Sequence, residues 1–93
     1  MQTSYESKAV VFKALSSPIR LAILEMLFEG ELCACEILAK FQITQPTLSH
    51  HMAILSDQDL VNWRKQGKWI YYSLNKEAFY GSQAFIQAIT SQS

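Results

Sequence analysis

The chain has 93 residues, which is enough for one domain with a single hydrophobic core. Apolar residues make up 49% and charged residues 17%, a composition that excludes a disordered chain. Basic and acidic residues number 8 each, and this zero net charge at first argues against a nucleic-acid-binding protein. No apolar run reaches the roughly 20 residues of a membrane span, and the polar segment 1–8 is unlike a signal peptide. We therefore expect a cytoplasmic protein with no membrane partner.

Hydrophobic periodicity predicts two helices in the first third of the chain. The first covers about residues 5–15. The second covers about residues 18–28, with Ser17 as its N-cap and Pro18 in its first turn.

Two further helices are predicted in the middle of the chain. The third is short, at about residues 34–41. Thr44 is expected to cap the fourth, whose buried positions recur at helical spacing. These positions are Leu48, Met52 and Leu55.

The pattern then changes to one typical of strands. Segments 60–64 and 69–74 are rich in Val, Ile, Trp and Tyr, and Gly67 between them suits a turn with positive φ, so a β-hairpin is predicted. A last helix follows at about residues 76–90.

This order of elements predicts a mainly α fold with a β-hairpin, that is, a winged helix-turn-helix in a single domain over residues 1–93. The helix-turn-helix covers about residues 33–56 and the wing about residues 60–74.

The fourth helix carries a polar face that can contact DNA. It has short hydroxyls, an amide and two imidazoles, and it has no carboxylate that would repel phosphate. The candidate DNA-binding residues are Gln45, Thr47, Ser49, His50 and His51. The alternatives are an ordinary solvated face and, for His51, packing beneath the helix. Adjacent residues point about 100° apart on a helix, which disfavours His50 and His51 as ligands of one metal ion.

The predicted hairpin is basic near its tip. Arg64, Lys65 and Lys68 lie there without an acid between them, which suits a wing that lies along DNA. The alternative is protection of an edge strand from aggregation by lysine. The zero net charge hides an uneven distribution, since residues 40–76 carry +3 while residues 1–39 carry −2.

Cys33 and Cys35 are the only cysteines of the chain. Cys33-x-x-Glu36 has the spacing of a capping box with a thiol in place of the hydroxyl, so Cys33 is expected at a non-helical N-cap where the two sulfurs can converge. Thiolates there would bind soft, thiophilic ions. Two alternatives stay open: two small buried residues without a ligand role, or a redox pair that forms a disulfide or persulfide.

Taken together, segments 31–36 and 44–52 resemble the ArsR/SmtB family of bacterial metalloregulatory repressors, in particular its arsenic-responsive branch. That branch carries a Glu-Leu-Cys-Val-Cys-Asp-Leu-Cys pattern followed by a Ser-Gln-Pro-Thr-Val-Ser-His-His-Leu recognition helix. Segment 14–24 is similar to the start of the family's second helix, and segment 67–72 fits its wing. The resemblance covers roughly residues 12–74.

The resemblance implies a homodimer paired through the first and last helices, about residues 5–15 and 76–90. Each protomer would place its recognition helix in the major groove of a palindromic operator. As(III) or Sb(III) would bind Cys33 and Cys35 as inducer and release the DNA, and no catalytic cofactor is implied. The family's third cysteine falls at Leu38 here, so the third ligand would be hydroxide or an external thiol. The zinc and cadmium site of other branches has no matching ligands on the last helix.

Three other functions are compatible with parts of the sequence. A repressor of the same fold could sense thiol oxidation or persulfide through its two cysteines. A thiol-disulfide enzyme is disfavoured because no thioredoxin-like pattern surrounds the cysteines, so we expect no enzymatic activity. A winged-helix module that binds only proteins would lack the salt-dependent affinity for DNA that the basic segment predicts.

Overall fold

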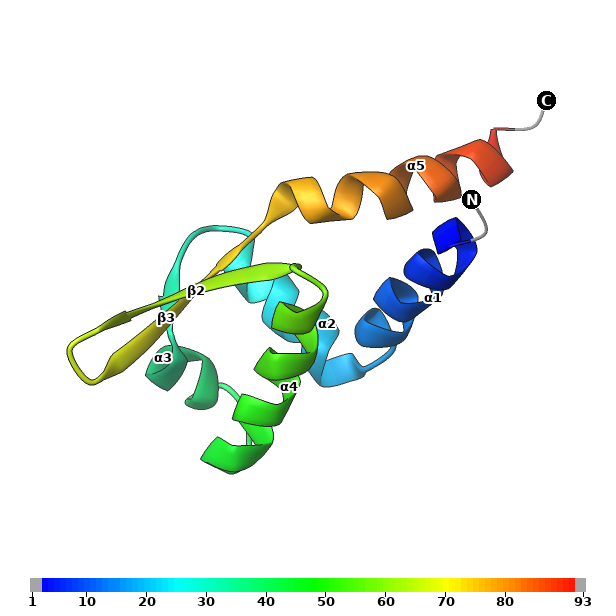
Figure 1. Cartoon of the computed structure of the whole chain (residues 1–93). Coiled ribbons are helices and arrows are strands. Elements are labelled where there is room, and N and C mark those ends of the chain that lie inside the picture. Colours follow the sequence, from blue (N-terminus) through cyan, green and yellow to red (C-terminus); the bar gives the residue numbers. More distant parts are fainter. Residues whose placement is uncertain (1–2, 92–93) are drawn as a thin grey trace.

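The computed structural model describes residues 3–91 and has the predicted helices and hairpin in the predicted order (Figure 1). The elements are α1 (Thr3–Leu15), α2 (Pro18–Leu27), β1 (Leu32–Cys33), α3 (Ala34–Leu38), α4 (Gln45–Asp57), β2 (Val61–Gln66), β3 (Trp69–Leu74), the 3₁₀ turn η1 (Lys76–Phe79) and α5 (Tyr80–Thr90). The fold class is therefore the predicted one, a mainly helical winged helix-turn-helix.

Side-chain caps fix where the two central helices begin. The Ser17 hydroxyl accepts a hydrogen bond from the Arg20 N–H at 3.2 Å at the start of α2. The Thr44 hydroxyl accepts one from the Thr47 N–H at 3.3 Å at the start of α4. Both predicted N-caps are confirmed, and each satisfies an amide that the helix itself leaves unpaired.

The core lies between α2, α3 and α4 and is closed by the segment that enters β2. Its fully buried aliphatic side chains include Ile23, Ile37, Leu55 and Leu60. The predicted buried stripe of α4 is confirmed, because Leu48, Met52 and Leu55 are all buried. This packing holds the opposite face of α4 outward.

The sheet has three antiparallel strands in the order β1-β3-β2. β2 and β3 form the predicted hairpin, and Gly67 has a positive φ of 64° in its turn. The turn is shorter than predicted, because β2 continues through Lys65 and Gln66. The small strand β1 was not predicted, since two residues are too few to show alternation. It pairs Leu32 with Tyr72 and Cys33 with Tyr71.

Two predicted helix boundaries are wrong. α3 ends at Leu38 rather than near Phe41, because the next amides bond three residues back: the Lys40 N–H donates to Ile37 at 3.0 Å and the Phe41 N–H to Leu38 at 3.2 Å. The last helix begins as the 3₁₀ turn η1 and becomes α-helical only at Tyr80. Tight turns of this kind are common at helix ends.

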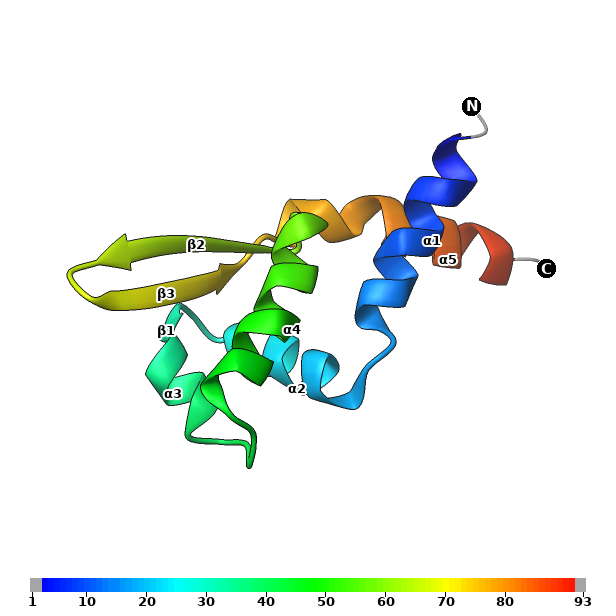
Figure 2. The same ribbon diagram turned by 60° about the horizontal axis from the view of Figure 1, so that its bottom comes forward.

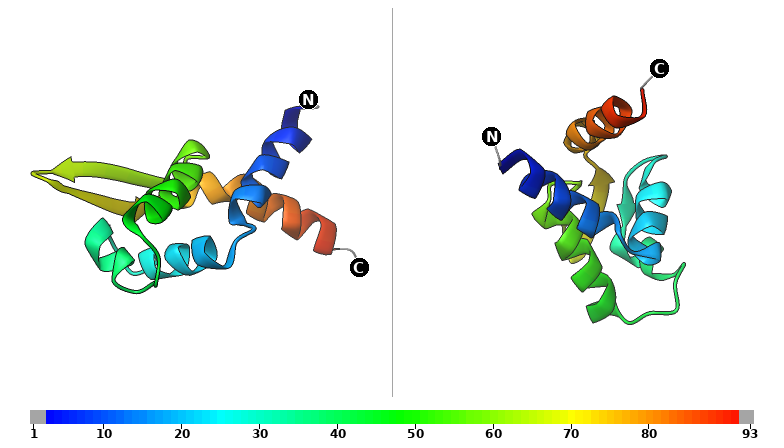
Figure 3. Two further views of the ribbon diagram at one scale, coloured as in Figure 1. Left: turned by 90° about the horizontal axis from the view of Figure 1, so that it is seen from below. Right: turned by 90° about the vertical axis from the view of Figure 1, so that its right-hand side faces the viewer.

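The molecule is elongated, with extents of 49 × 24 × 21 Å. The β2–β3 hairpin projects at one end, and α1 and α5 lie together at the other (Figures 2 and 3). The rings of Phe12 and Phe85 join these two helices, with centroids 6.3 Å apart. Within residues 3–91, no helix is both long enough and apolar enough to cross a membrane.

Candidate DNA interface and cysteine site

The polar residues of the first turns of α4 lie at the surface, opposite the buried stripe. Gln45, Thr47, Ser49 and His50 are all exposed. The Thr44 hydroxyl donates to the Thr47 hydroxyl at 3.0 Å, which orients the Thr47 side chain. This face therefore presents an amide, hydroxyls and an imidazole without a carboxylate.

His51 has a different environment from the other four candidates. It is partly buried, and its Nδ1 lies 3.0 Å from an Nη of Arg20 on α2. A guanidinium can only donate, so Nδ1 accepts and the neutral ring carries its proton on Nε2. Burial, the charge of Arg20 and His50 all lower the pKa of His51. The Nδ1 side of the His51 ring therefore packs beneath the helix against Arg20, as one of the alternatives above proposed.

The three basic candidates of the hairpin are exposed, with Arg64 and Lys65 on β2 and Lys68 in the turn. The guanidinium of Arg64 is nevertheless hydrogen-bonded to an acidic side chain, a contact that the sequence did not predict. Its Nε and one Nη each donate to a carboxylate oxygen of Glu31 at 2.8 Å. The guanidinium also lies over the Tyr71 ring, 4.7 Å from its centroid.

The Glu31–Arg64 pair shifts both ionisation equilibria. The hydrogen bond from Arg64 lowers the pKa of Glu31, and the same bond raises the pKa of Arg64. Both groups thus stay charged, and Glu31 offsets one positive charge of the wing. The tip of the hairpin itself carries no acid, as predicted, but β1 brings the preceding segment to the sheet and places Glu31 beside Arg64.

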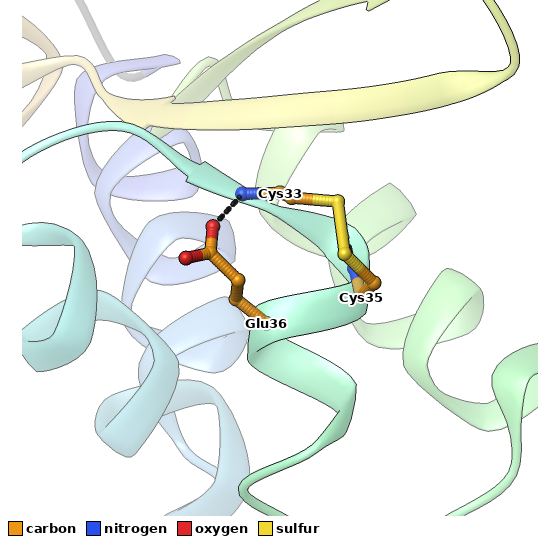
Figure 4. Close-up of a disulfide and its surroundings, with 3 residues drawn as sticks. All are labelled: Cys33, Cys35 and Glu36. Atoms are coloured by element: carbon orange, nitrogen blue, oxygen red, sulfur yellow. Dashed lines mark hydrogen bonds between the residues drawn. A yellow bond between two sulfur atoms is a disulfide. The ribbon is translucent and has the colours of Figure 1, made fainter.

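The cysteines lie where the sheet ends and α3 begins (Figure 4). Cys33 is the N-cap of α3, in an extended conformation with φ −69° and ψ 145°. Its N–H donates to the Glu36 carboxylate at 2.7 Å, and its sulfur accepts from the Cys35 N–H at 3.2 Å. The predicted capping box, with the sulfur of Cys33 in place of a hydroxyl, is confirmed.

The two sulfur atoms are joined as a disulfide, which is one of the two bonds that the redox alternative allowed. The extended backbone at Cys33 allows this contact, whereas residues two apart on a regular helix point about 200° from each other. Cys33 is 5% exposed, while Cys35 lies at the surface. The alternative of two small buried cysteines is therefore wrong, because only Cys33 is buried.

The donor set at this site consists of the two sulfurs. Among residues 3–91, no group of three or more His, Cys, Asp or Glu side chains could hold a metal ion. Two soft sulfur donors, once reduced, suit a thiophilic ion that can take another ligand from outside the chain.

A second surface is formed by α1 and α5 at the far end of the molecule. The apolar side chains of Tyr80, Ile86 and Ile89 are about half exposed on α5. Ile86 also lines a cavity of about 540 Å³ with Phe12 and Leu15 of α1. Contiguous exposed apolar surface is common at interaction sites.

Two contact residues, Arg20 and Glu31, were missed by the sequence analysis. Arg20 is an arginine two residues after a helix-starting proline, a position with no signal of its own. Glu31 stands next to the cysteine motif, and only the unpredicted strand β1 places it beside the wing.

The amino-acid sequence is similar to those of known transcriptional regulators. A model of the bacterial regulatory protein arsR family matches residues 17–62. The chain is 53% identical over 74 residues to an arsenical resistance operon repressor of Staphylococcus xylosus, an alignment that covers 80% of this chain and 71% of that protein. It is 51% identical over 72 residues to the corresponding repressor of Staphylococcus aureus, with 77% and 69% covered.

The fold is shared with solved structures. The crystal structure of an ArsR family transcriptional regulator superposes with a TM-score of 0.86 at 27% sequence identity, covering 92% of this chain and 89% of that one. The similarity thus includes the terminal helices as well as the helix-turn-helix and the wing.

Proposed function

Because the chain belongs to the ArsR family of bacterial regulatory proteins, we propose that it is a repressor that binds operator DNA as a homodimer and is released by As(III) or Sb(III). The family consists of transcriptional regulators, which supports a regulatory and not an enzymatic role for this chain. The dimer, the operator contacts and the inducer are the proposed parts. Such a repressor acts in the cytoplasm, where thiols are kept reduced.

The exposed face of α4 is proposed to read the operator. Gln45 can bond an adenine edge, and Thr47, Ser49 and His50 can bond base edges or phosphate. Lys65 and Lys68 of the wing would contact the backbone. His51 and Arg64 stay candidate contacts through the atoms that Arg20 and Glu31 leave unused.

The α1–α5 surface is proposed to join two protomers. Pairing would bury the exposed isoleucines of α5 and place two α4 helices on one side of the dimer. Two-fold symmetry then sets half-sites about one helical turn, roughly 34–36 Å, apart. A palindromic operator is expected for this arrangement.

The observation that carries the proposed regulation is the position of Cys33. This one residue ends β1, which pairs with β3 of the wing, and caps α3, which precedes the recognition helix. A metalloid held by the reduced sulfurs of Cys33 and Cys35 would compete with the Cys35 N–H bond to sulfur. The resulting distortion at Cys33 would be passed to the wing through β3 and to α4 through α3. A coupling of about 1–3 kcal/mol would lower DNA affinity roughly 5–150-fold.

The test is a titration of reduced protein against an operator duplex selected by the protein from random DNA. We expect fluorescence anisotropy to show specific binding that arsenite or antimonite reverses. The Cys33→Ala, Cys35→Ala variant should bind the same duplex and ignore both ions. Release of this variant by arsenite would contradict the cysteine assignment.

The disulfide favours a second candidate, a repressor regulated by thiol oxidation. Peroxide would convert the two thiols to a disulfide while it is itself reduced to two molecules of water. In that case the oxidised and reduced proteins differ in operator affinity without any metalloid. Mass spectrometry after peroxide or polysulfide treatment, paired with anisotropy, separates the candidates: equal affinity of the two forms would exclude this one.

A further inference from the structure

A cavity of about 230 Å³ lies between α3, the start of α4 and β3, directly beside the cysteines. Cys35 contributes to its wall, and because the two sulfurs are in contact, that of Cys33 is adjacent. Leu38 of α3, Leu48 of α4 and Ile70 of β3 give the wall an apolar character. The DNA-contacting role proposed for α4 does not explain this cavity.

The size and lining of the cavity suit a small organic group. An apolar cavity of about 150 Å³ is enough to bind benzene in a protein interior. The cavity beside Cys35 is larger, and two of its lining residues, Trp69 and Tyr72, are aromatic. A methyl or phenyl group would therefore fit within it.

The number of sulfur ligands that the chain can offer also favours an arsenical with an organic group. Trivalent arsenic forms three bonds, and the chain offers two cysteines and no other. An arsenical that already carries one carbon substituent needs two thiolates only. Its third bond, to carbon, then leads away from the two sulfurs.

We propose that the cavity is a subsite for the organic substituent of a monosubstituted trivalent arsenical bound by Cys33 and Cys35. This inference rests on the proposed function and narrows its ligand class. In the binding step the two As–O bonds of R–As(OH)₂ break and two As–S bonds form. The two thiol protons leave with the hydroxides as two molecules of water, and the oxidation state of arsenic does not change.

The position of the subsite connects its occupation to DNA release. The cavity wall includes Gln45 and Ser49 of α4 and Lys68 of the wing, all candidate DNA contacts. A substituent between α4 and β3 would thus separate the two elements that hold the operator. We expect a substituted arsenical to release DNA at lower concentration than arsenite does.

The test compares phenylarsine oxide with sodium arsenite by calorimetric titration of protein reduced with a phosphine. The Leu38→Trp and Ile70→Trp variants fill the cavity from α3 and from β3. The Leu21→Trp variant is the matched control, because Leu21 is 53% exposed on α2 and takes no part in the cavity. Thermal unfolding followed by circular dichroism checks that each variant is folded.

We expect the wild type and the Leu21→Trp variant to share one ratio of phenylarsine oxide to arsenite affinity. Either cavity-filling variant should lower this ratio about tenfold or more, the effect expected when a ring loses its apolar site, and leave arsenite affinity unchanged. An unchanged ratio in both filled variants, or an equal loss for both arsenicals, would overturn the subsite while leaving arsenite regulation intact. Wild-type protein that binds neither arsenical would contradict the proposed function as well.

Discussion

The side chain of Arg20 on α2 contacts both His51 on α4 and Ala14 on α1. One Nη lies 3.0 Å from Nδ1 of His51 on α4, and Nε donates to the carbonyl oxygen of Ala14 at the end of α1 at 2.6 Å. Arg20 itself is in the first turn of α2. The recognition helix is thereby tied to the proposed dimer helix α1 by a single side chain, through an imidazole that must be neutral to accept the bond.

This contact predicts a loss of stability in mild acid. Because the pKa of His51 is lowered from its usual 6.5, the folded state binds fewer protons at this ring than the unfolded state does. The resulting stabilisation is complete above about pH 6.5 and declines as pH falls toward the lowered value. We expect His51→Gln to reduce this part of the pH dependence, measured by urea unfolding at about pH 7.5 and pH 5.5.

His50→Gln is the matched control for this prediction, since His50 is the adjacent imidazole and is exposed. It should keep most of the pH dependence of the wild type, because burial and Arg20, the two larger causes of the lowered pKa of His51, are still present. The same slope in the His51→Gln variant as in the wild type would contradict the assignment.

Removal of the Glu31 charge should strengthen binding to DNA. Glu31→Gln removes the negative charge beside Arg64 and leaves one oxygen in place of the two that accept its hydrogen bonds, so Arg64 is held less firmly and can contact a phosphate. We expect higher affinity for a labelled duplex of random sequence, and a plot of log affinity against log salt that is steeper by up to about one unit. Fluorescence anisotropy at several salt concentrations measures both.

The control is Glu29→Gln, which removes one exposed negative charge from the same loop without touching Arg64. A similar gain in both variants would show that net charge alone is responsible. Arg64→Ala in the Glu31→Gln background should cancel the specific gain.

The capping box of α3 gives a prediction about stability. Glu36→Ala removes the carboxylate that accepts the Cys33 N–H at 2.7 Å and leaves this partly buried amide without its partner. We expect a loss of about 1 kcal/mol in the free energy of unfolding. Glu36→Gln keeps an acceptor oxygen in place and should lose less, so equal losses in the two variants would argue against the hydrogen bond as the cause.

The proposed dimer predicts the effect of a charge on α5. Ile86→Glu places a carboxylate in the apolar surface formed with α1, where pairing would have to desolvate it. We expect a monomer in sedimentation velocity and weaker operator binding. Leu21→Glu puts the same charge on a similarly exposed leucine of α2, and this variant should stay dimeric. If the Ile86→Glu variant is also a dimer, the dimer interface does not include this part of α5.

Sequence patterns with a strong local cause predicted most of the fold. Ser17 and Thr44 cap helices as expected because hydroxyls at these positions bond nearby amides. The stripe of α4 and the capping spacing of Cys33 and Glu36 were equally reliable. Each depends on residues at most a few positions apart in the chain.

The parts that could not be predicted depend on long-range contacts. Arg20 and His51 are 31 residues apart, and Glu31 and Arg64 are 33 apart. Neither pair has a sequence signal, because each forms only after the core has packed. The polar face of α4 was therefore identified correctly as exposed, and packing of His51 beneath the helix was among the alternatives, but neither its partner Arg20 nor the position of Glu31 beside the wing was identified.

The two-residue strand β1 has a consequence for how a signal travels. Regulators commonly need tens of ångströms of packed residues to connect an effector with its response. Here Cys33 is itself hydrogen-bonded into the sheet of the wing and is at the same time the first link of the helix-turn-helix. The proposed sensor residue thus contacts the sheet of the wing directly and begins α3, the helix that precedes α4, so a chemical event at its sulfur would act on both at short range.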